Sequence, residues 1–86
     1  MANYSIELKR SAAKELADLP VKDRGRIVAR IQALAEDPRP PGAEKLSGQE
    51  RYRVRQGDYR ILYEIHDQIL LIVVVRIAHR RDVYRK

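Results

Sequence analysis

The chain has 86 residues, of which 44% are hydrophobic, so it has room for one compact domain with a single core. It contains no cysteine, which excludes disulfides, thiolate nucleophiles and cysteine-based zinc sites. The formal net charge is +6, and residues 51–86 hold nine of the 18 Lys and Arg residues but four of the 12 acidic ones. The expected partner is a polyanion, although charge alone equally allows a basic surface that only keeps the protein soluble.

No targeting or membrane-spanning segment is expected. Residues 1–5 lack the positive region followed by an apolar run that marks a signal peptide. The longest apolar run, residues 69–75, is far shorter than the roughly 20 residues of a membrane span. The sequence therefore predicts a soluble, cytoplasmic protein.

The N-terminal half predicts a strand and a helical hairpin. Residues 4–8 alternate between apolar and polar, which is typical of a half-buried strand. Residues 9–18 predict a short helix, and the step Leu19-Pro20 ends it because the residue before a proline disfavours helical geometry. Residues 21–36 predict a second helix, whose apolar stripe consists of Ile27, Val28, Ile31, Leu34 and Ala35.

A proline-rich loop separates the hairpin from the β half. Three prolines stiffen this loop, which we predict over residues 37–49. Residues 51–56 alternate strictly and predict a strand. Tyr52 and Val54 lie on one face of this strand, and the other face carries Arg51, Arg53 and Arg55.

The remaining chain predicts two more strands. Residues 57–58 form a turn, residues 59–66 a strand, and residues 67–68 a two-residue hairpin connection. Residues 69–77 are apolar on both faces, which indicates a central strand. The order β-α-α-β-β-β predicts one α+β domain over residues 1–86, with the helical hairpin packed on one face of a small, mostly antiparallel sheet.

Cationic side chains recur at positions that antiparallel strands bring together. Arg53 and Arg55 share a strand face, Arg60 begins the next strand, and Arg80 and Tyr84 follow the last strand. Four clustered cations repel one another, by about 1 kcal/mol or less per exposed pair, so a phosphate is the natural occupant. Taken singly, each arginine is more simply a solvated strand residue and Tyr84 an edge-packing aromatic.

Patterns of the common active sites are absent from the sequence. There is no glycine-rich phosphate loop and no GxSxG motif, and His66 and His79 are not spaced as metal ligands. We therefore expect no metal and no small-molecule cofactor.

Two sequence blocks carry a resemblance to a known family. Residues 46–65, with the GDYR element at 57–60, resemble the central block of the RelE/ParE toxin superfamily. Residues 78–85, with the HRRDVY element, resemble the closing block of its RelE branch, and upstream residues fit as well. The resemblance implies a RelE/ParE-like fold and the toxin of a type II toxin–antitoxin system. Such a toxin cleaves mRNA in the ribosomal A site and is neutralised by a cognate antitoxin.

The resemblance also implies a metal-free mechanism, in which the ribose 2′-OH attacks the adjacent phosphate. Arg60 and Arg80 match the residues that stabilise the phosphorane, and Tyr84 matches the residue that stacks on a base or transfers a proton. Arg53 and Arg55 stand where the best-known members have lysines, and an arginine is a poor proton donor or acceptor because its pKa exceeds about 12. Further contacts with RNA or the ribosome are predicted for Lys45, Arg51, Arg81, Arg85 and Lys86.

Three alternatives stay open at this stage. His79 is a candidate general base, or else a structural residue at the sheet edge. A ParE-type toxin, which inhibits DNA gyrase by binding and cleaves nothing, shares the fold, although that branch generally lacks the full basic and tyrosine set. A plain RNA-binding module would need aromatic platforms on the basic face, whereas Tyr52 is predicted on the face opposite Arg53 and Arg55.

Overall fold

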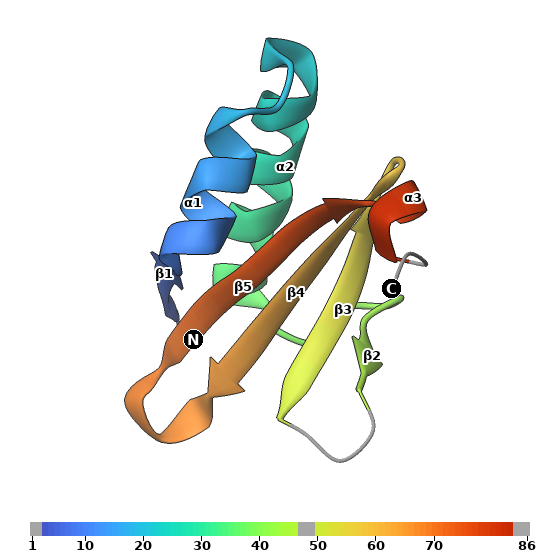
Figure 1. Cartoon of the computed structure of the whole chain (residues 1–86). Helices are drawn as coiled ribbons and strands as arrows, with labels where there is room; N and C mark the ends of the chain where they lie inside the picture. The colour runs from blue at the N-terminus through green and yellow to red at the C-terminus, as the bar shows by residue number, and fades with distance from the viewer. Residues whose placement is uncertain (1–2, 47–49, 84–86) are drawn as a thin grey trace.

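The computed structural model describes residues 3–46 and 50–83. Its five strands form one sheet of order β1-β5-β4-β3-β2, with two helices on it (Figure 1), so the predicted α+β fold is confirmed. No helix within these ranges has the length and apolarity needed to span a membrane. The elements are β1 (Ser5–Leu8), α1 (Arg10–Ala17), α2 (Val21–Glu36), β2 (Glu44–Lys45), β3 (Arg51–Gln56), β4 (Tyr59–His66), a 3₁₀ turn (Asp67–Ile69), β5 (Leu71–His79) and α3 (Arg80–Val83).

Strand β5 lies inside the sheet, as its two apolar faces predicted. It runs antiparallel to β4 along its whole length and parallel to β1 along its first half. The parallel pairing starts with Ser5 opposite Leu71 and ends with Leu8 opposite Val74. The sheet is therefore mixed, with one parallel pair in an otherwise antiparallel arrangement.

Beyond Val74, helix α1 replaces β1 as the neighbour of β5. The Ser11 hydroxyl donates a hydrogen bond of 3.1 Å to the carbonyl oxygen of Val75. The backbone N–H of Ile77 donates to Glu15 Oε1 at 2.7 Å. Helix side chains thus satisfy backbone groups that a neighbouring strand would otherwise pair.

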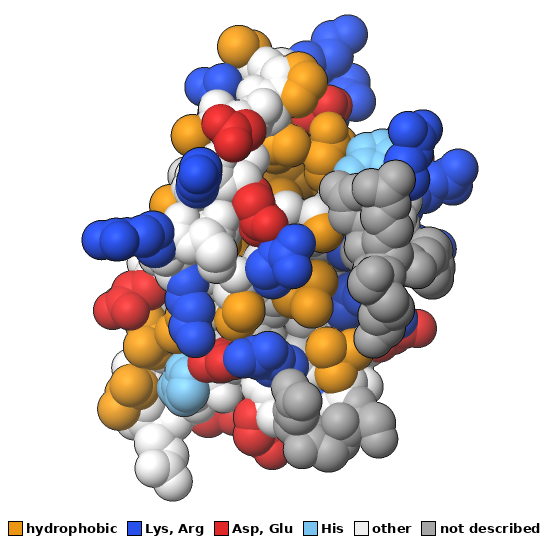
Figure 2. Space-filling model, viewed as in Figure 1, with side chains coloured by type: hydrophobic (Ala, Val, Ile, Leu, Met, Phe, Trp, Pro, Cys, Tyr) orange, Lys and Arg blue, Asp and Glu red, His pale blue; other side chains and the backbone are white. Residues whose placement is uncertain are grey.

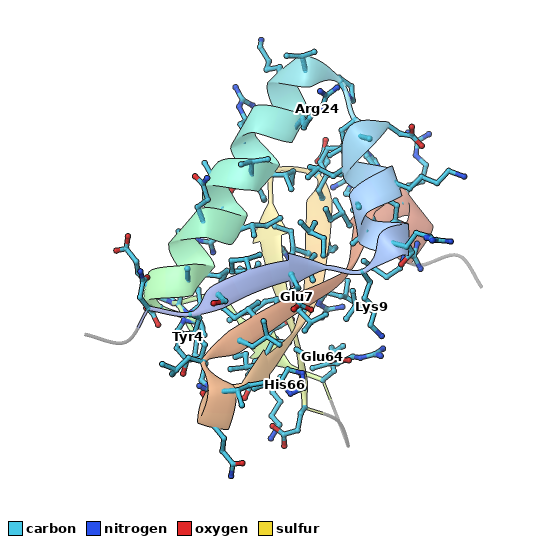
Figure 3. The ribbon with its side chains drawn as sticks, turned by 90° about the vertical axis from the view of Figure 1, so that its left-hand side faces the viewer. Tyr4, Glu7, Lys9, Arg24, Glu64 and His66 are labelled. Carbon is cyan, nitrogen blue, oxygen red and sulfur yellow. The ribbon has the colours of Figure 1, made fainter. Side chains whose placement is uncertain are left out.

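The core lies between the two helices and one face of the sheet. Figure 3 shows both helices on the same side of β1 and β5, with side chains filling the space between them. The alternation in β3 is confirmed, because Tyr52 and Val54 are buried while Arg55 on the opposite face is exposed. The core residues are Ala12, Ile27, Ile31 and Leu34 from the helices, and Tyr52, Val54, Ile61, Tyr63, Ile65, Ile72, Val74 and Ile77 from the sheet.

The turn between β4 and β5 is longer than predicted. Asp67–Ile69 form a 3₁₀ turn, and Leu70 has a left-handed backbone with φ of +52°. Strand β5 therefore spans residues 71–79, and the predicted range of 69–77 is wrong by two residues at each end. The apolar side chains of Ile69 and Leu70, which suggested a strand, are exposed in the turn.

Two short elements were not predicted. Strand β2 lies within the segment predicted as a loop and pairs antiparallel with β3, placing Glu44 opposite Arg53. Helix α3 begins immediately after β5. Both are too short to leave a pattern in the sequence, since two residues cannot alternate visibly and four make only one helical turn.

An exposed ion pair connects three segments that are distant in sequence. Arg39, in the loop after α2, contacts Asp67 through Nη2–Oδ2 and Nη1–Oδ1 distances of 2.8 and 3.2 Å. The Tyr4 hydroxyl, just before β1, donates to Asp67 Oδ1 at 2.7 Å. The hydrogen bonds from Arg39 and then from Tyr4 lower the pKa of Asp67 to about 2.

Because the pKa of Asp67 is lowered, the stability of the fold should change with pH in the acidic range. Because the ordinary pKa of Asp67 is 3.8, its ionised form stabilises the fold above that pH and the contribution is lost as the pH falls towards 2. We expect wild type to be more stable than Asp67→Asn at neutral pH and the margin to vanish near pH 2. Urea unfolding over a pH series measures this, with Asp18→Asn as the control. A margin that is constant with pH would contradict the assignment.

Candidate functional site

The site lies at the end of the sheet where β3 turns into β4. Gly57 occupies this turn with φ of +60°, a backbone geometry that favours glycine. The turn fixes the antiparallel register, so that Arg55 on β3 lies directly opposite Arg60 on β4. Like charges directly opposite one another destabilise a strand pair, so packing alone does not favour this arrangement.

Helix α3 adds two more arginines at the same end of the sheet. The backbone N–H of Arg80 donates a hydrogen bond of 2.6 Å to the carbonyl oxygen of Asp58, in the β3–β4 turn. The backbone N–H of Arg81 donates to Nδ1 of His79, the last residue of β5, at 3.2 Å. These bonds fix the first turn of α3 beside the β3–β4 turn (Figure 1).

Together these segments line a cleft of about 610 Å³ that is open to solvent. We call it the arginine cleft. Figure 2 shows Lys and Arg side chains beside a histidine near α3, at this end of the molecule. Four guanidiniums and one carboxylate line the cleft, whose residues are Arg55, Asp58, Arg60, His79, Arg80 and Arg81.

Arg60 is the buried member of the arginine cleft. It is 5% exposed, and every other charged residue whose burial the structure describes is at least partly exposed. Within that part of the chain, no carboxylate lies within 4.0 Å of its guanidinium. A buried cation without a counter-charge in direct contact costs free energy, and an anion bound in the cleft would offset that cost.

Arg80 and Arg81 complete the positive lining with different surroundings. Arg80 Nε lies 4.0 Å from Asp58 Oδ1, a contact between two exposed side chains that contributes little. Arg81 was predicted as an RNA contact rather than a catalytic residue, and it lines the same cleft as Arg55 and Arg60. The sequence predicted that Arg53, Arg55, Arg60 and Arg80 converge with Tyr84. Arg55, Arg60 and Arg80 line the cleft together with Arg81, whereas Arg53 does not line it and Tyr84 lies outside the described residues.

Arg53 lies on the same sheet face but outside the cleft lining. Its Nη2 is 2.7 Å from Oε1 of Glu44 on β2. The hydrogen bond from Arg53 and the charges of Arg53, Arg55 and Arg60 lower the pKa of Glu44. Glu44 is therefore ionised and a weak proton acceptor, and it partly neutralises Arg53. No pattern in the sequence indicated Glu44, because only the pairing of β2 with β3 brings it next to Arg53.

The other predicted contact residues are spread more widely. Arg51 lies opposite Glu64 in the register, with an Nε–Oε2 distance of 3.2 Å. Lys45 Nζ lies 3.4 Å from Glu50 Oε2. Neither residue lines the arginine cleft, so their roles in RNA binding stay predictions. The remaining predicted residues, Tyr84, Arg85 and Lys86, lie outside the described residues.

Acidic and histidine side chains do not form a metal-binding group in the described ranges, where no three or more His, Cys, Asp or Glu side chains cluster. The carboxylates near the cleft instead form ion pairs with arginines, Glu44 with Arg53 and Asp58 with Arg80. The four arginines that line the cleft are hydrogen-bond donors with positive charge, and such a set suits the binding of an anion.

Comparison with known proteins identifies the family. A family model described as the ParE toxin of the type II toxin–antitoxin system parDE matches residues 6–84. Toxin RelG of Mycobacterium tuberculosis is 30% identical over 87 residues, which cover 96% of this chain and 98% of RelG.

Solved structures agree with this match. A chain of the archaeal RelE–RelB complex from Pyrococcus horikoshii OT3 superposes with a TM-score of 0.82 at 26% identity, covering 100% of both chains. A chain of the RelBE2 toxin–antitoxin complex of Mycobacterium tuberculosis gives 0.81 at 26% identity, covering 91% of this chain and 99% of that one. The chain therefore belongs to the RelE/ParE superfamily of type II toxin–antitoxin toxins, as its two sequence blocks predicted.

Proposed function

We propose that this toxin is a ribosome-dependent endoribonuclease that cleaves mRNA in the ribosomal A site. The observation that supports this function is the arginine cleft, which holds the buried Arg60 directly opposite Arg55. Such a cluster is unfavourable for folding and favourable for stabilising a phosphate that gains negative charge. Ribosome dependence also assigns the protein to the cytoplasm.

The proposed reaction is an in-line attack of the ribose 2′-OH on the adjacent phosphorus. The new P–O2′ bond forms as the P–O5′ bond breaks, leaving a 2′,3′-cyclic phosphate and a 5′-hydroxyl. The 2′-OH loses its proton and the departing O5′ gains one. Arg60 and Arg80 stabilise the charge on the non-bridging oxygens, and Arg55 and Arg81 hold flanking phosphates.

Arginine supplies charge in this scheme and not proton transfer, because its guanidinium stays protonated at any working pH. Arg53, paired with Glu44, contacts the RNA backbone further along the sheet. Tyr84 keeps its predicted role in base stacking or proton transfer. The step needs no metal, because the nucleophile belongs to the RNA itself.

The shape of the site supports the proposed dependence on the ribosome. As far as residues 3–46 and 50–83 line it, the arginine cleft is open to solvent and consists mainly of charged side chains, which offer few surfaces to hold a nucleobase. Cleavage nevertheless requires the 2′-oxygen, the phosphorus and the 5′-oxygen in line, and fixing that geometry makes a large contribution to the rate. We therefore assign the ordering of the mRNA to the ribosome and the stabilisation of charge to the toxin.

A cognate antitoxin is the second proposed partner, because related toxins have been solved as RelE–RelB and RelBE complexes. Two surfaces suit such a partner. The arginine cleft accepts acidic side chains, and an apolar groove of about 240 Å³ between β1, α1 and α2 accepts apolar ones. The groove is lined by Ile6, Leu8, Leu16, Val28, Ile31 and Gln32.

The alternative is a ParE-type toxin that binds DNA gyrase without cleaving RNA. The description of the matching family model as a ParE toxin favours it. Gyrase inhibition by binding alone would not need a buried arginine directly opposite a second arginine, so the arginine cleft favours RNA cleavage.

The deciding experiment is primer extension on mRNA in programmed ribosomes, with free mRNA as the control. We expect cuts confined to the A-site codon, absent from free mRNA, and fragments ending in a 2′,3′-cyclic phosphate. Purified gyrase is assayed in parallel at the same toxin concentrations. Trapping of gyrase on DNA without cleavage of translated mRNA would overturn the proposal in favour of the ParE-type function.

A further inference from the structure

His79 stands at the junction between β5 and α3. The backbone N–H of Arg81 donates a hydrogen bond of 3.2 Å to Nδ1 of His79. This is the geometry of a helix N-cap, in which a side-chain acceptor bonds the N–H of the second helical residue. Asn, Asp, Ser and Thr usually fill this position, and here an imidazole nitrogen does.

The cap fixes the tautomer of the histidine ring. An Nδ1 that accepts a hydrogen bond carries no proton, so the neutral ring carries its proton on Nε2. The acceptor lone pair of the neutral ring is the one on Nδ1, and it is already bonded to Arg81. A general base needs a free lone pair within reach of the 2′-OH, so this contact speaks against the base role.

The imidazole ring of His79 also packs against Tyr59. Tyr59 lies opposite His79 in the β4–β5 register, and the two rings meet edge to face with centroids 5.3 Å apart. The Tyr59 hydroxyl donates to Asp23 Oδ2 on α2 at 3.2 Å. The ring therefore has a packed partner that connects it to the helical layer.

Helix α3 depends on such contacts because it has one turn. Isolated helices shorter than about 12 residues are marginal in water, so four residues need external support. Two hydrogen bonds donated by backbone N–H groups supply it in the described part of the chain, from Arg80 to the carbonyl oxygen of Asp58 and from Arg81 to Nδ1 of His79. The second of these is a side-chain bond, so a substitution can remove it.

We infer that His79 is a positioning residue, which caps α3 through Nδ1 and so holds Arg80 and Arg81 in the arginine cleft, and is not the general base. The catalytic consequence rests on the proposed RNA cleavage, whereas the cap itself does not. Two substitutions separate the cap from the base. In His79→Asn the amide oxygen lies near the position of Nδ1, and in His79→Gln it lies near that of Nε2.

Cleavage rates on programmed ribosomes should then differ between the two variants. We expect His79→Asn to stay within about twofold of wild type and His79→Gln to lose about five- to tenfold, the cost of an N-cap. Both variants should lose a hundredfold or more if His79 is the base. Equal activity in both, at any level, overturns the inference. The matched control is His66→Asn, at the opposite end of β4 beside Glu64 (Figure 3).

A measurement without RNA keeps this test separate from the proposed function. Nitrogen-15 NMR of the isolated toxin reports the ring tautomer, and amide exchange reports the Arg81 N–H. We expect a proton on Nε2, and Arg81 protection in wild type and His79→Asn but not in His79→Gln. If this pattern holds and wild type cuts no RNA, the cap stands and the proposed function fails. A proton on Nδ1 overturns the cap itself.

Discussion

Replacing Arg60 by alanine should lower the rate of A-site cleavage by roughly a hundred- to a thousandfold, the usual cost of removing one preorganised charge-stabilising group. Arg60 is buried, so its guanidinium is held in place and weakly screened by water. It lies opposite Arg55 and lines the arginine cleft. Single-turnover cleavage of mRNA bound to programmed ribosomes measures the effect without the contribution of ribosome binding.

Two further variants show whether the loss comes from the charge. Arg60→Met keeps most of the side-chain volume and should be as inactive as Arg60→Ala, with thermal stability equal to or above that of wild type. Removing a buried cation relieves the repulsion from Arg55, so this substitution should not destabilise the fold as most substitutions of buried residues do. Arg76→Ala is the matched control, because Arg76 is exposed on β5 and paired with Glu15 at 2.8 Å. Arg60→Met with near wild-type activity would refute the role assigned to Arg60.

Replacing Tyr63 by alanine should lower the free energy of unfolding by about 3–5 kcal/mol, the range for large aromatic residues in cores. Tyr63 is 0% exposed, and its ring stacks on Tyr52 with centroids 5.9 Å apart. Its hydroxyl donates a hydrogen bond of 2.7 Å to the carbonyl oxygen of Pro38, which attaches the proline loop to the sheet. Small domains have total stabilities of about 5–15 kcal/mol, so this variant should lose a large share of its stability.

The hydroxyl contribution is isolated by Tyr63→Phe. That variant keeps the ring and the stacking but leaves the Pro38 carbonyl without its donor, so we expect a loss of about 1 kcal/mol. Urea unfolding followed by circular dichroism measures both variants. Equal losses for Tyr63→Phe and Tyr63→Ala would contradict the assignment, because the ring would then contribute nothing.

The sequence predicted the arrangement of the arginines because strand periodicity and a tight turn determine it. Alternation in β3 assigned Arg53 and Arg55 to one face and Tyr52 to the other, which the structure confirms. The Gly57-Asp58 turn then left little freedom in the register, so Arg60 had to face Arg55. Local geometry was sufficient for this part of the site.

Other features of the site depend on contacts that no local pattern encodes. Alternation gives the face of Arg60 but not its burial, which depends on how elements distant in sequence pack together. Glu44 reaches Arg53 through a strand of two residues. The capping bond of His79 requires the chain to turn into α3 immediately after β5, and four residues give no helical stripe.

The change of neighbour at Val74, from strand β1 to helix α1, limits how copies of the toxin can associate. Sheets join edge to edge when a strand offers unpaired N–H and C=O groups to another chain. Past Val74 those groups on β5 are already bonded to Ser11 and Glu15. The outermost strands, β1 and β2, have four and two residues, which makes them poor templates for a further strand. The edges formed by β1, β2 and the second half of β5 therefore offer few unpaired backbone groups to the sheet of a second copy.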